Sequence, residues 1–264
     1  MAKKQLARER ILNCMPSQGT EKDWTTLTAD RVGALRARAA LPKSKDLREP
    51  WWEVGDQGET GSCVGWACAE GVLRWHFVKA QRLANNRRLS TRFTWMAAKE
   101  IDEFTDAPTS FIDADGTSLK AALDVSRKYG AVLDSVLPFG RGRLYAGETE
   151  DFYAIASERK IMRYFNLGRD PSAWRRWIAT NGPILARLDC DNTFMEAKET
   201  RGKLVRYRAS DQLGGHAVCL VGYTPEHFIV RNSWGTTIWG DKGFAYASRA
   251  YAEAAFTETY GVEV

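Results

Sequence analysis

Three stretches in the first half of the chain carry apolar residues at the spacing of one helix face. The first begins at Cys63 and repeats at steps of three and four through Val64, Ala67, Gly71, Trp75 and Val78. A second amphipathic run covers residues 91 to about 103, and a third begins near Thr117 and ends at Gly130, a residue suited to a helix C-cap. Residues 56 to about 140 are therefore predicted to form a mostly helical lobe.

The second half of the chain changes to short apolar or alternating runs, which are typical of strands. A predicted helix that ends at Thr180 precedes all of them. Asp170 is its favourable N-cap, and Pro171 suits its first position. The predicted strands are Ile184–Leu188, Lys203–Tyr207, Ala217–Tyr223, His227–Arg231 and Gly243–Ala247. Residues 155 to 264 are thus predicted to form a β-lobe, which gives the chain an α+β class with two lobes.

Residues 1–45 precede this two-lobed domain, which is expected to cover 46–264. They contain a basic start and one predicted helix from about Thr28 to Ala39, closed by Pro42. Two readings of this N-terminal leader are open from the sequence. It either lies on or near a functional cleft as a strap, or packs on the back of the domain. Cys14, within it, is read as incidental rather than as a redox latch.

Composition limits the possible partners and locations of the chain. The 44% hydrophobic content includes no apolar run of membrane-spanning length, and no apolar segment of a secretory signal follows the basic N-terminus. We therefore expect a cytoplasmic protein with no membrane partner, with a specialised export route still open. The net charge of +5, from 38 basic and 33 acidic residues, is mild and scattered, so no nucleic-acid partner is expected.

The five cysteines show no paired spacing, which argues for a reducing compartment without structural disulfides. The chain has no CxxC or HxxxH motif. Besides the histidine discussed below, it has only His76 and His227. A metal site is therefore not expected, and no cofactor is implied.

One cysteine lies where a glycine-rich turn, residues 56–62, meets the first predicted helix. Ser62 is a suitable N-cap, which places Cys63 in the first helical turn. Unpaired amide N–H groups and the positive end of the helix dipole favour the thiolate, the nucleophilic form of cysteine. Because a free cysteine is more often inert packing, this position alone does not decide whether the thiol is reactive.

Three more residues accompany this cysteine in a suggestive order. Gln57 lies shortly before it, where the Gln57 side-chain amide and the Cys63 backbone N–H can face the same point. Far downstream, His216 begins an apolar run directly after two glycines. Asn232 follows another predicted strand, within the sequence RNSWG. The order Gln, Cys, His, Asn suits a thiol nucleophile with its base and donors.

These stretches resemble the papain family of cysteine peptidases. The matching segments are residues 56–67, 216–223 and 230–244, the last reading VRNSWGTTIWGDKGF, and the resemblance covers roughly residues 44–264. It implies a papain-like fold in which a helical lobe packs against an antiparallel β-barrel-like lobe, with an active-site cleft between them. Cys63 and His216 would lie on opposite walls of that cleft.

The resemblance also implies a role for each residue in a cysteine endopeptidase that acts on peptides or proteins. Cys63 would attack the scissile carbonyl, and His216 would hold the thiolate as imidazolium and later protonate the leaving amine. Asn232 would accept a hydrogen bond from the far imidazole nitrogen, and Gln57 would help the Cys63 N–H to stabilise the oxyanion. Trp234 would cover the His–Asn contact and shield it from water.

Substrate contacts are expected, by the same resemblance, from residues beside this centre. They are Gly116, Ser118, Arg187, Gly215, Ala217 and Trp234. Arg187 interrupts an apolar strand. It favours acidic or polar substrate side chains if it faces the pocket, and is an ordinary solvated arginine if the register turns it outward.

Two other functions keep the same fold. One is a catalytically idle member that binds peptides or a partner, although such a binder needs no complete set of Cys63, His216, Asn232 and Gln57. The other is acyl transfer to an amine, as in a ligase or transpeptidase. If the strap reading of residues 1–45 holds, the leader would also inhibit the enzyme within the same chain.

Overall fold

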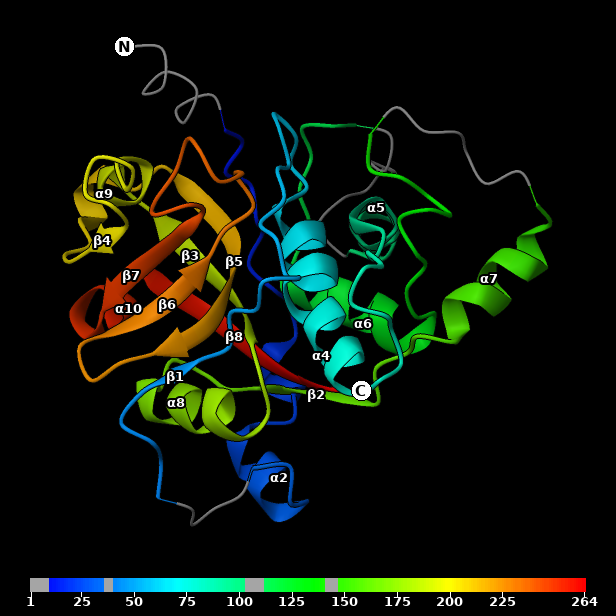
Figure 1. Ribbon diagram of the computed structural model, residues 1–264, viewed down its shortest axis with the longest axis horizontal. Coiled ribbons are helices and arrows are strands. Elements are labelled where there is room, and N and C mark those ends of the chain that lie inside the picture. The colour runs from blue at the N-terminus through cyan, green and yellow to red at the C-terminus, as the bar shows by residue number, and fades with distance from the viewer. Residues whose placement is uncertain (1–9, 36–39, 103–111, 141–146) are drawn as a thin grey trace.

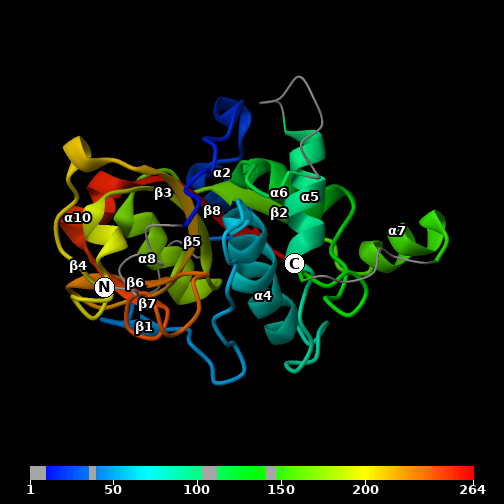
Figure 2. The ribbon, with the colours of Figure 1, turned by 90° about the horizontal axis from the view of Figure 1, so that it is seen from above.

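The computed structural model describes residues 10–35, 40–102, 112–140 and 147–264. The helices between residues 63 and 157 gather in one half of the molecule. Most of the sheet lies in the other half together with the helices that follow residue 170, and the dark-blue N-terminal segment runs between the two halves (Figure 1). The view from above shows the same separation, with α5 (Thr91–Ile101) and α7 (Thr149–Ser157) far from β6 (His227–Arg231) and β7 (Phe244–Ser248) (Figure 2). This arrangement agrees with the predicted α+β fold of two lobes.

The helices of the described residues begin with two short ones in the leader, continue through the helical half and end with those that lie beside the sheet. They are η1 (Thr20–Lys22), α2 (Thr26–Arg31), α3 (Cys63–Gly65), the π-helix η2 (Trp66–Leu73), α4 (Arg74–Lys79), α5 (Thr91–Ile101), α6 (Leu119–Lys128), α7 (Thr149–Ser157), α8 (Pro171–Thr180), α9 (Asn192–Met195), η3 (Ala209–Asp211) and α10 (Arg249–Ala255). Helices α3, η2 and α4 follow one another without a break, so the predicted helix at Cys63 is present.

The described strands form one open sheet in the order β2-β8-β3-β5-β6-β7-β4, with β1 paired to β5. Their bounds are β1 (Lys45–Asp46), β2 (Arg163–Asn166), β3 (Ile184–Cys190), β4 (Lys203–Leu204), β5 (Gly214–Tyr223), β6 (His227–Arg231), β7 (Phe244–Ser248) and β8 (Phe256–Glu263). The order does not close on itself, so the expected barrel is not found. The β4–β7 pair is also parallel, in an otherwise antiparallel sheet.

Several predicted elements differ in extent. The leader helix ends at Arg31, because Gly33 takes a positive φ of 75° that breaks the helix; residues 36–39 of the predicted helix lie outside the described part. The predicted strand Lys203–Tyr207 shortens to β4. Strands β2 and β8 and helices α7 and α10 were not predicted. The helix cap at Gly130 is confirmed by its φ of 103° and its N–H bond to the Val125 carbonyl.

The helix that carries Cys63 packs directly on strand β5, which carries His216. Gly71 in η2 makes this possible, since a Cβ there would come within 2.1 Å of the Cys219 Sγ on β5. The Cys219 thiol in turn donates to the Ala67 carbonyl of η2 at 3.2 Å. This close helix–sheet approach fixes the helix that carries Cys63 relative to the strand that carries His216.

Within the described residues, no helix has the length and apolar character needed to cross a membrane.

The leader divides into two parts. Residues 20–35 pack on the β-lobe, where the Asn166 N–H of β2 donates to the Trp24 carbonyl and Asn181 donates through Nδ2 to the Ala34 carbonyl. Residues 10–19 instead cross between the lobes, with Asn13 bridged to Gly215 and Met15 bridged to Ser118. Both readings of the leader are therefore present, each in a different part of it.

Candidate active site

Cys63 begins helix α3 and is fully buried. Interactions with the Cys14 thiol and with His216, including the charge of His216, lower the pKa of the Cys63 thiol well below its ordinary value. Ser62 occupies the N-cap position as predicted, but its hydroxyl pairs with the Thr60 hydroxyl at 2.6 Å and makes no cap bond. Helix capping by Ser62 was therefore wrong, and the thiolate is favoured mainly by side chains.

His216 lies near the start of β5 and is completely buried. Its Nε2 is 2.7 Å from Oδ1 of Asn232. Because an amide oxygen only accepts, Nε2 carries the hydrogen in this contact. The other ring nitrogen, Nδ1, has no hydrogen bond of ordinary geometry and is free to serve the Cys63 thiol. Asn232 thus fixes the ring so that Nδ1 is the nitrogen available to sulfur.

An aromatic cluster encloses this imidazole. Trp234 is fully buried, with its ring centroid 4.9 Å from that of His216. Phe194, just after β3, lies 5.6 Å from the His216 ring and 4.8 Å from Trp239. Trp234 therefore covers the histidine as predicted. Phe194 and Trp239 were missed, because nothing local in the sequence shows that two more distant aromatics meet the same ring.

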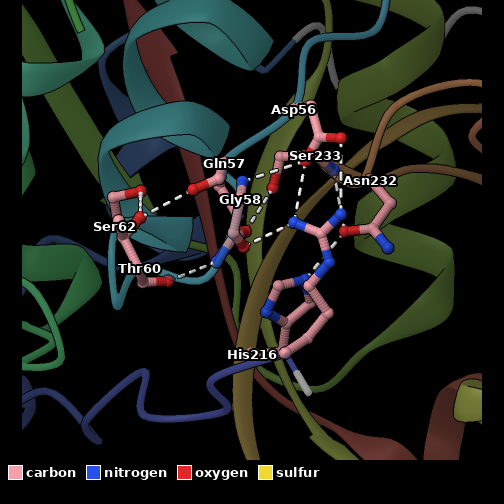
Figure 3. Close-up of polar contacts among 9 residues, drawn as sticks. Asp56, Gln57, Gly58, Thr60, Ser62, His216, Asn232 and Ser233 are labelled. Atoms are coloured by element: carbon pink, nitrogen blue, oxygen red, sulfur yellow. Dashed lines mark hydrogen bonds and ion pairs between the residues drawn. The ribbon is translucent and has the colours of Figure 1, made fainter. Parts of the chain in front are cut away.

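Gln57 is held in one orientation beside this cluster (Figure 3). Its Oε1 accepts the Ser233 hydroxyl at 2.7 Å, and its Nε2 donates to the Thr60 carbonyl at 2.8 Å. The Gln57 backbone N–H also donates to the Ser233 carbonyl at 2.9 Å. Since Ser233 follows Asn232 directly, Gln57 is tied to the segment that orients His216. An amide nitrogen has two hydrogens, so one N–H of Nε2 remains beyond the Thr60 contact.

The leader lies on this centre in main-chain contact with both lobes. Cys14 donates its N–H to the Gly215 carbonyl at 2.9 Å, and Met15 donates to the Thr117 carbonyl at 3.1 Å. At the preceding end, Arg10 forms an ion pair with Asp56 at 2.8 Å. Cys14 itself is buried beside Cys63. Residues 10–15 therefore occupy the space directly above the sulfur and imidazole.

Three glycines leave room for this leader backbone. A Cβ on Gly116 would come within 2.1 Å of the Asn13 carbonyl oxygen, and one on Gly215 within 2.3 Å of the Cys14 carbonyl oxygen. Gly214 would likewise meet the Leu12 carbonyl at 2.4 Å. Gly116 and Gly215, both expected to contact substrate, here contact the leader. A side chain at position 215, directly before His216, would clash with the leader backbone, which explains why this position is a glycine.

Arg187 faces the cleft side of the sheet. It lies opposite Ala217 in the β3–β5 register and donates through Nε to the Cys14 carbonyl at 3.0 Å. Its Nη1 also reaches Asp189 at 2.9 Å and the Thr257 hydroxyl at 2.7 Å. The solvated alternative for Arg187 is therefore wrong, since the side chain is buried. Ala217 is buried, and Ser118 caps α6 by accepting the Ala121 N–H.

The family of the chain follows from comparison with known proteins. A family model described as papain family cysteine protease matches residues 41–262. The chain belongs to this family. It is a cysteine peptidase of the hydrolase class.

Relatives and solved structures agree with this placement. Cathepsin B-like CP3 of Giardia intestinalis is 25% identical over 94% of this chain and 89% of its own length. Cysteine proteinase B of Leishmania mexicana is 28% identical, and the chain spans only 46% of that protein. Among solved structures, xylellain, a cysteine protease from Xylella fastidiosa, has a TM-score of 0.79 at 22% identity and covers 97% of both chains. proCathepsin B S9 from Trypanosoma congolense has a TM-score of 0.71 at 16% identity. The two structures share the fold.

Proposed function

We propose that this papain-family chain is a cysteine endopeptidase in which the Cys63 thiolate and the His216 imidazolium form the reacting pair. The observation that carries the proposal is the linked set of contacts from Asn232 to His216 to Cys63. It combines the 2.7 Å Nε2–Oδ1 contact with a lowered thiol pKa. A nucleophile, its base and an orienting group thus meet in one buried centre.

The chemistry then proceeds in two stages. Cys63 Sγ attacks the scissile carbonyl carbon, the C–N bond breaks, and His216 Nδ1 gives its proton to the leaving amine. Water activated by the same nitrogen next attacks the thioester, releases the acid and restores the thiol. The Cys63 N–H and the remaining N–H of Gln57 Nε2 would bind the oxyanion. Loss of one such donor costs about 100- to 1,000-fold in turnover in other hydrolases.

The leader would keep this enzyme inactive until it is displaced. Residues 10–15 occupy the space through which a substrate would reach Cys63, and the Cys14 and Met15 N–H groups bond the Gly215 and Thr117 carbonyls that border it. We therefore propose intramolecular inhibition by the leader, followed by its removal. Because Asp46 pairs with Gly222 of β5 as part of the sheet, cleavage is expected before it, near residues 42–46.

The test compares the purified wild-type protein with Cys63→Ala and His216→Ala during incubation under reducing conditions. Mass spectrometry should show loss of the leader only in the wild type. The trimmed protein should then hydrolyse unstructured peptides. A peptide library would also show whether Arg187 selects acidic or polar side chains, against the alternative of a plain leucine or phenylalanine preference.

Two outcomes would contradict the assignment. Trimming and hydrolysis that persist in Cys63→Ala would place the activity elsewhere. A Cys63 thiol that reacts with iodoacetamide no faster than a small free thiol, even after the leader is removed by an added protease, would indicate an idle binding protein. Addition of a primary amine distinguishes hydrolysis from acyl transfer, since amide products would form in place of acids.

A further inference from the structure

Cys14, a leader residue beside Cys63, is held by two main-chain hydrogen bonds. Its backbone N–H donates to the Gly215 carbonyl at 2.9 Å, and its carbonyl accepts Nε of Arg187 at 3.0 Å. The side chain is 2% exposed. Between these two main-chain bonds the Cys14 side chain lies buried beside Cys63, and its thiol contacts the Met15 carbonyl at 3.9 Å. The leader thus presents a second sulfur to the first.

The other described cysteines have different surroundings. Cys68 contacts the Ser126 hydroxyl at 3.9 Å, and Cys219 donates to the Ala67 carbonyl at 3.2 Å. Cys190 lies at the end of β3. The charge of Cys63 contributes to raising the Cys190 pKa, but no side-chain hydrogen bond joins the two residues. Cys14 is therefore the cysteine that the described structure pairs with Cys63, and Cys190 is the natural comparison.

The two thiols differ in pKa. This difference suits a reaction in which one thiol is oxidised first and the other then forms the disulfide. Interactions with Cys14 and His216 lower the pKa of Cys63, so its sulfur is the nucleophilic thiolate. Burial raises the pKa of Cys14, so its thiol keeps its proton. Low-pKa thiols are the ones that peroxides oxidise, and a neighbouring thiol then resolves the product. Neither sulfur is engaged in a disulfide in the structure.

We propose that Cys14 is a resolving cysteine that forms a reversible disulfide with Cys63 after oxidation by a hydroperoxide. In the first step the Cys63 thiolate attacks one peroxide oxygen and the O–O bond breaks. With one proton taken up, this gives the Cys63 sulfenic acid and water, or an alcohol from an organic peroxide. In the second step the Cys14 sulfur displaces the hydroxyl from the Cys63 sulfur. The S–S bond forms, and the Cys14 proton leaves with the hydroxyl as a second water.

The consequence is a leader that is covalently fixed over the cleft, while the catalytic sulfur is protected from higher oxidation. A dithiol reverses the reaction, because it reduces the S–S bond to two thiols and is itself oxidised to a disulfide. Only this regulatory consequence depends on the proposed peptidase activity of Cys63. The disulfide itself needs the two sulfurs and a peroxide.

The test uses the full chain, reduced and freshly purified, with an intact mass that shows residues 1–45 still attached. A few equivalents of hydrogen peroxide are added, remaining thiols are blocked, and the protein is digested with trypsin without reduction. Mass spectrometry should find peptide 11–22, which holds Cys14, joined to peptide 49–74, which holds Cys63. Fragment ions distinguish Cys63 from Cys68 in the latter. Dithiothreitol should separate the pair and restore nearly all of the Cys63 thiol.

Cys14→Ser is the decisive variant and Cys190→Ser its matched control. Peroxide should carry Cys63 of Cys14→Ser to sulfinic and sulfonic acids, with loss of most of the dithiothreitol-recoverable thiol, whereas Cys190→Ser should behave as the wild type. A Cys63–Cys190 bond, an over-oxidised Cys63 beside a free Cys14, or full thiol recovery in Cys14→Ser would each overturn the proposal. If Cys14→Ser does not fold, the wild-type peptide map decides alone. Since the readout is mass, a chain that forms this disulfide but hydrolyses no peptide after reduction and removal of its leader would retain this inference and refute the peptidase.

Discussion

The strength with which the leader holds the cleft closed can be tested at Asp23. This carboxylate lies directly after η1, with 3% of its side chain exposed. It forms an ion pair with Lys120 at 2.7 Å, accepts the Tyr260 hydroxyl at 2.8 Å and accepts Asn166 Nδ2 at 3.1 Å. The three partners come from α6, β8 and β2, so one leader side chain joins both lobes. We predict that Asp23→Asn loosens the leader from the cleft.

The magnitude follows from the loss of a charged acceptor. A hydrogen bond to a charged group contributes about 1.5–3 kcal/mol, and the isosteric amide removes the charge and one acceptor oxygen. If only the closed leader uses these bonds, the open population rises about 10- to 150-fold, at about 1.4 kcal/mol for each factor of ten.

The assay is the rate at which iodoacetamide alkylates Cys63, followed by mass spectrometry of peptide 49–74. Alkylation requires an open leader, so its rate reports the open population. Cys68, buried under α6, is an internal control in the same peptide and should stay unlabelled in both proteins. Asp151→Asn, an exposed site on α7, is the matched variant and should label at the wild-type rate.

Two results would refute this reasoning. An unchanged Cys63 labelling rate in Asp23→Asn would mean that the leader is held by its backbone bonds alone. Labelling of Cys68 together with Cys63 would mean that the substitution unfolds the lobe instead of releasing the leader.

Three further predictions concern pH, stability and the groove. Because its pKa is lowered, Cys63 should be alkylated at pH values below the ordinary thiol range. Its rate should fall only as the pH drops through that lowered pKa, and His216→Ala should move the profile upward; identical profiles would contradict the ion pair. Glu70→Gln should lower the free energy of unfolding by about 3–5 kcal/mol in urea, since Glu70 is buried and pairs with Arg74 at 2.9 Å, whereas the exposed Glu253→Gln should change it by less than about 1 kcal/mol. Gly116→Ala should expose Cys63 to alkylation by displacing the leader carbonyl, and a wild-type rate would show that the groove can widen.

The amino-acid sequence was sufficient to predict the family and to nominate the residues of the candidate site. The order of Gln57, Cys63, His216 and Asn232 predicted a thiol centre, and the structure brings the last three into contact. The helix that carries Cys63 and the strand that carries His216 were also predicted, because local hydrophobic periodicity is strong in both segments. Local patterns decide elements of this kind without reference to the rest of the chain.

Elements whose stability comes from distant partners were not predictable. Strand β8 follows α10 directly and exists through its pairing with β3 and β2, and β4 is cut to two residues by its single partner β7. Pairing energy arises between segments far apart in sequence, so no local pattern marks it. The same reason explains the absence of Phe194 and Trp239 from the predicted site.

The sequence by itself determined the family of this protein, the residues proposed to react, and the helix and strand that carry them. Only the tertiary structure decided that the leader crosses the cleft, that Arg187 turns toward it, and that the Cys14 sulfur meets the Cys63 sulfur. The residue type sets the chemical groups that a side chain offers, so these groups are known from the sequence. Which groups become neighbours depends on backbone pairing and packing across many residues, and those energies are set only when the whole chain is folded.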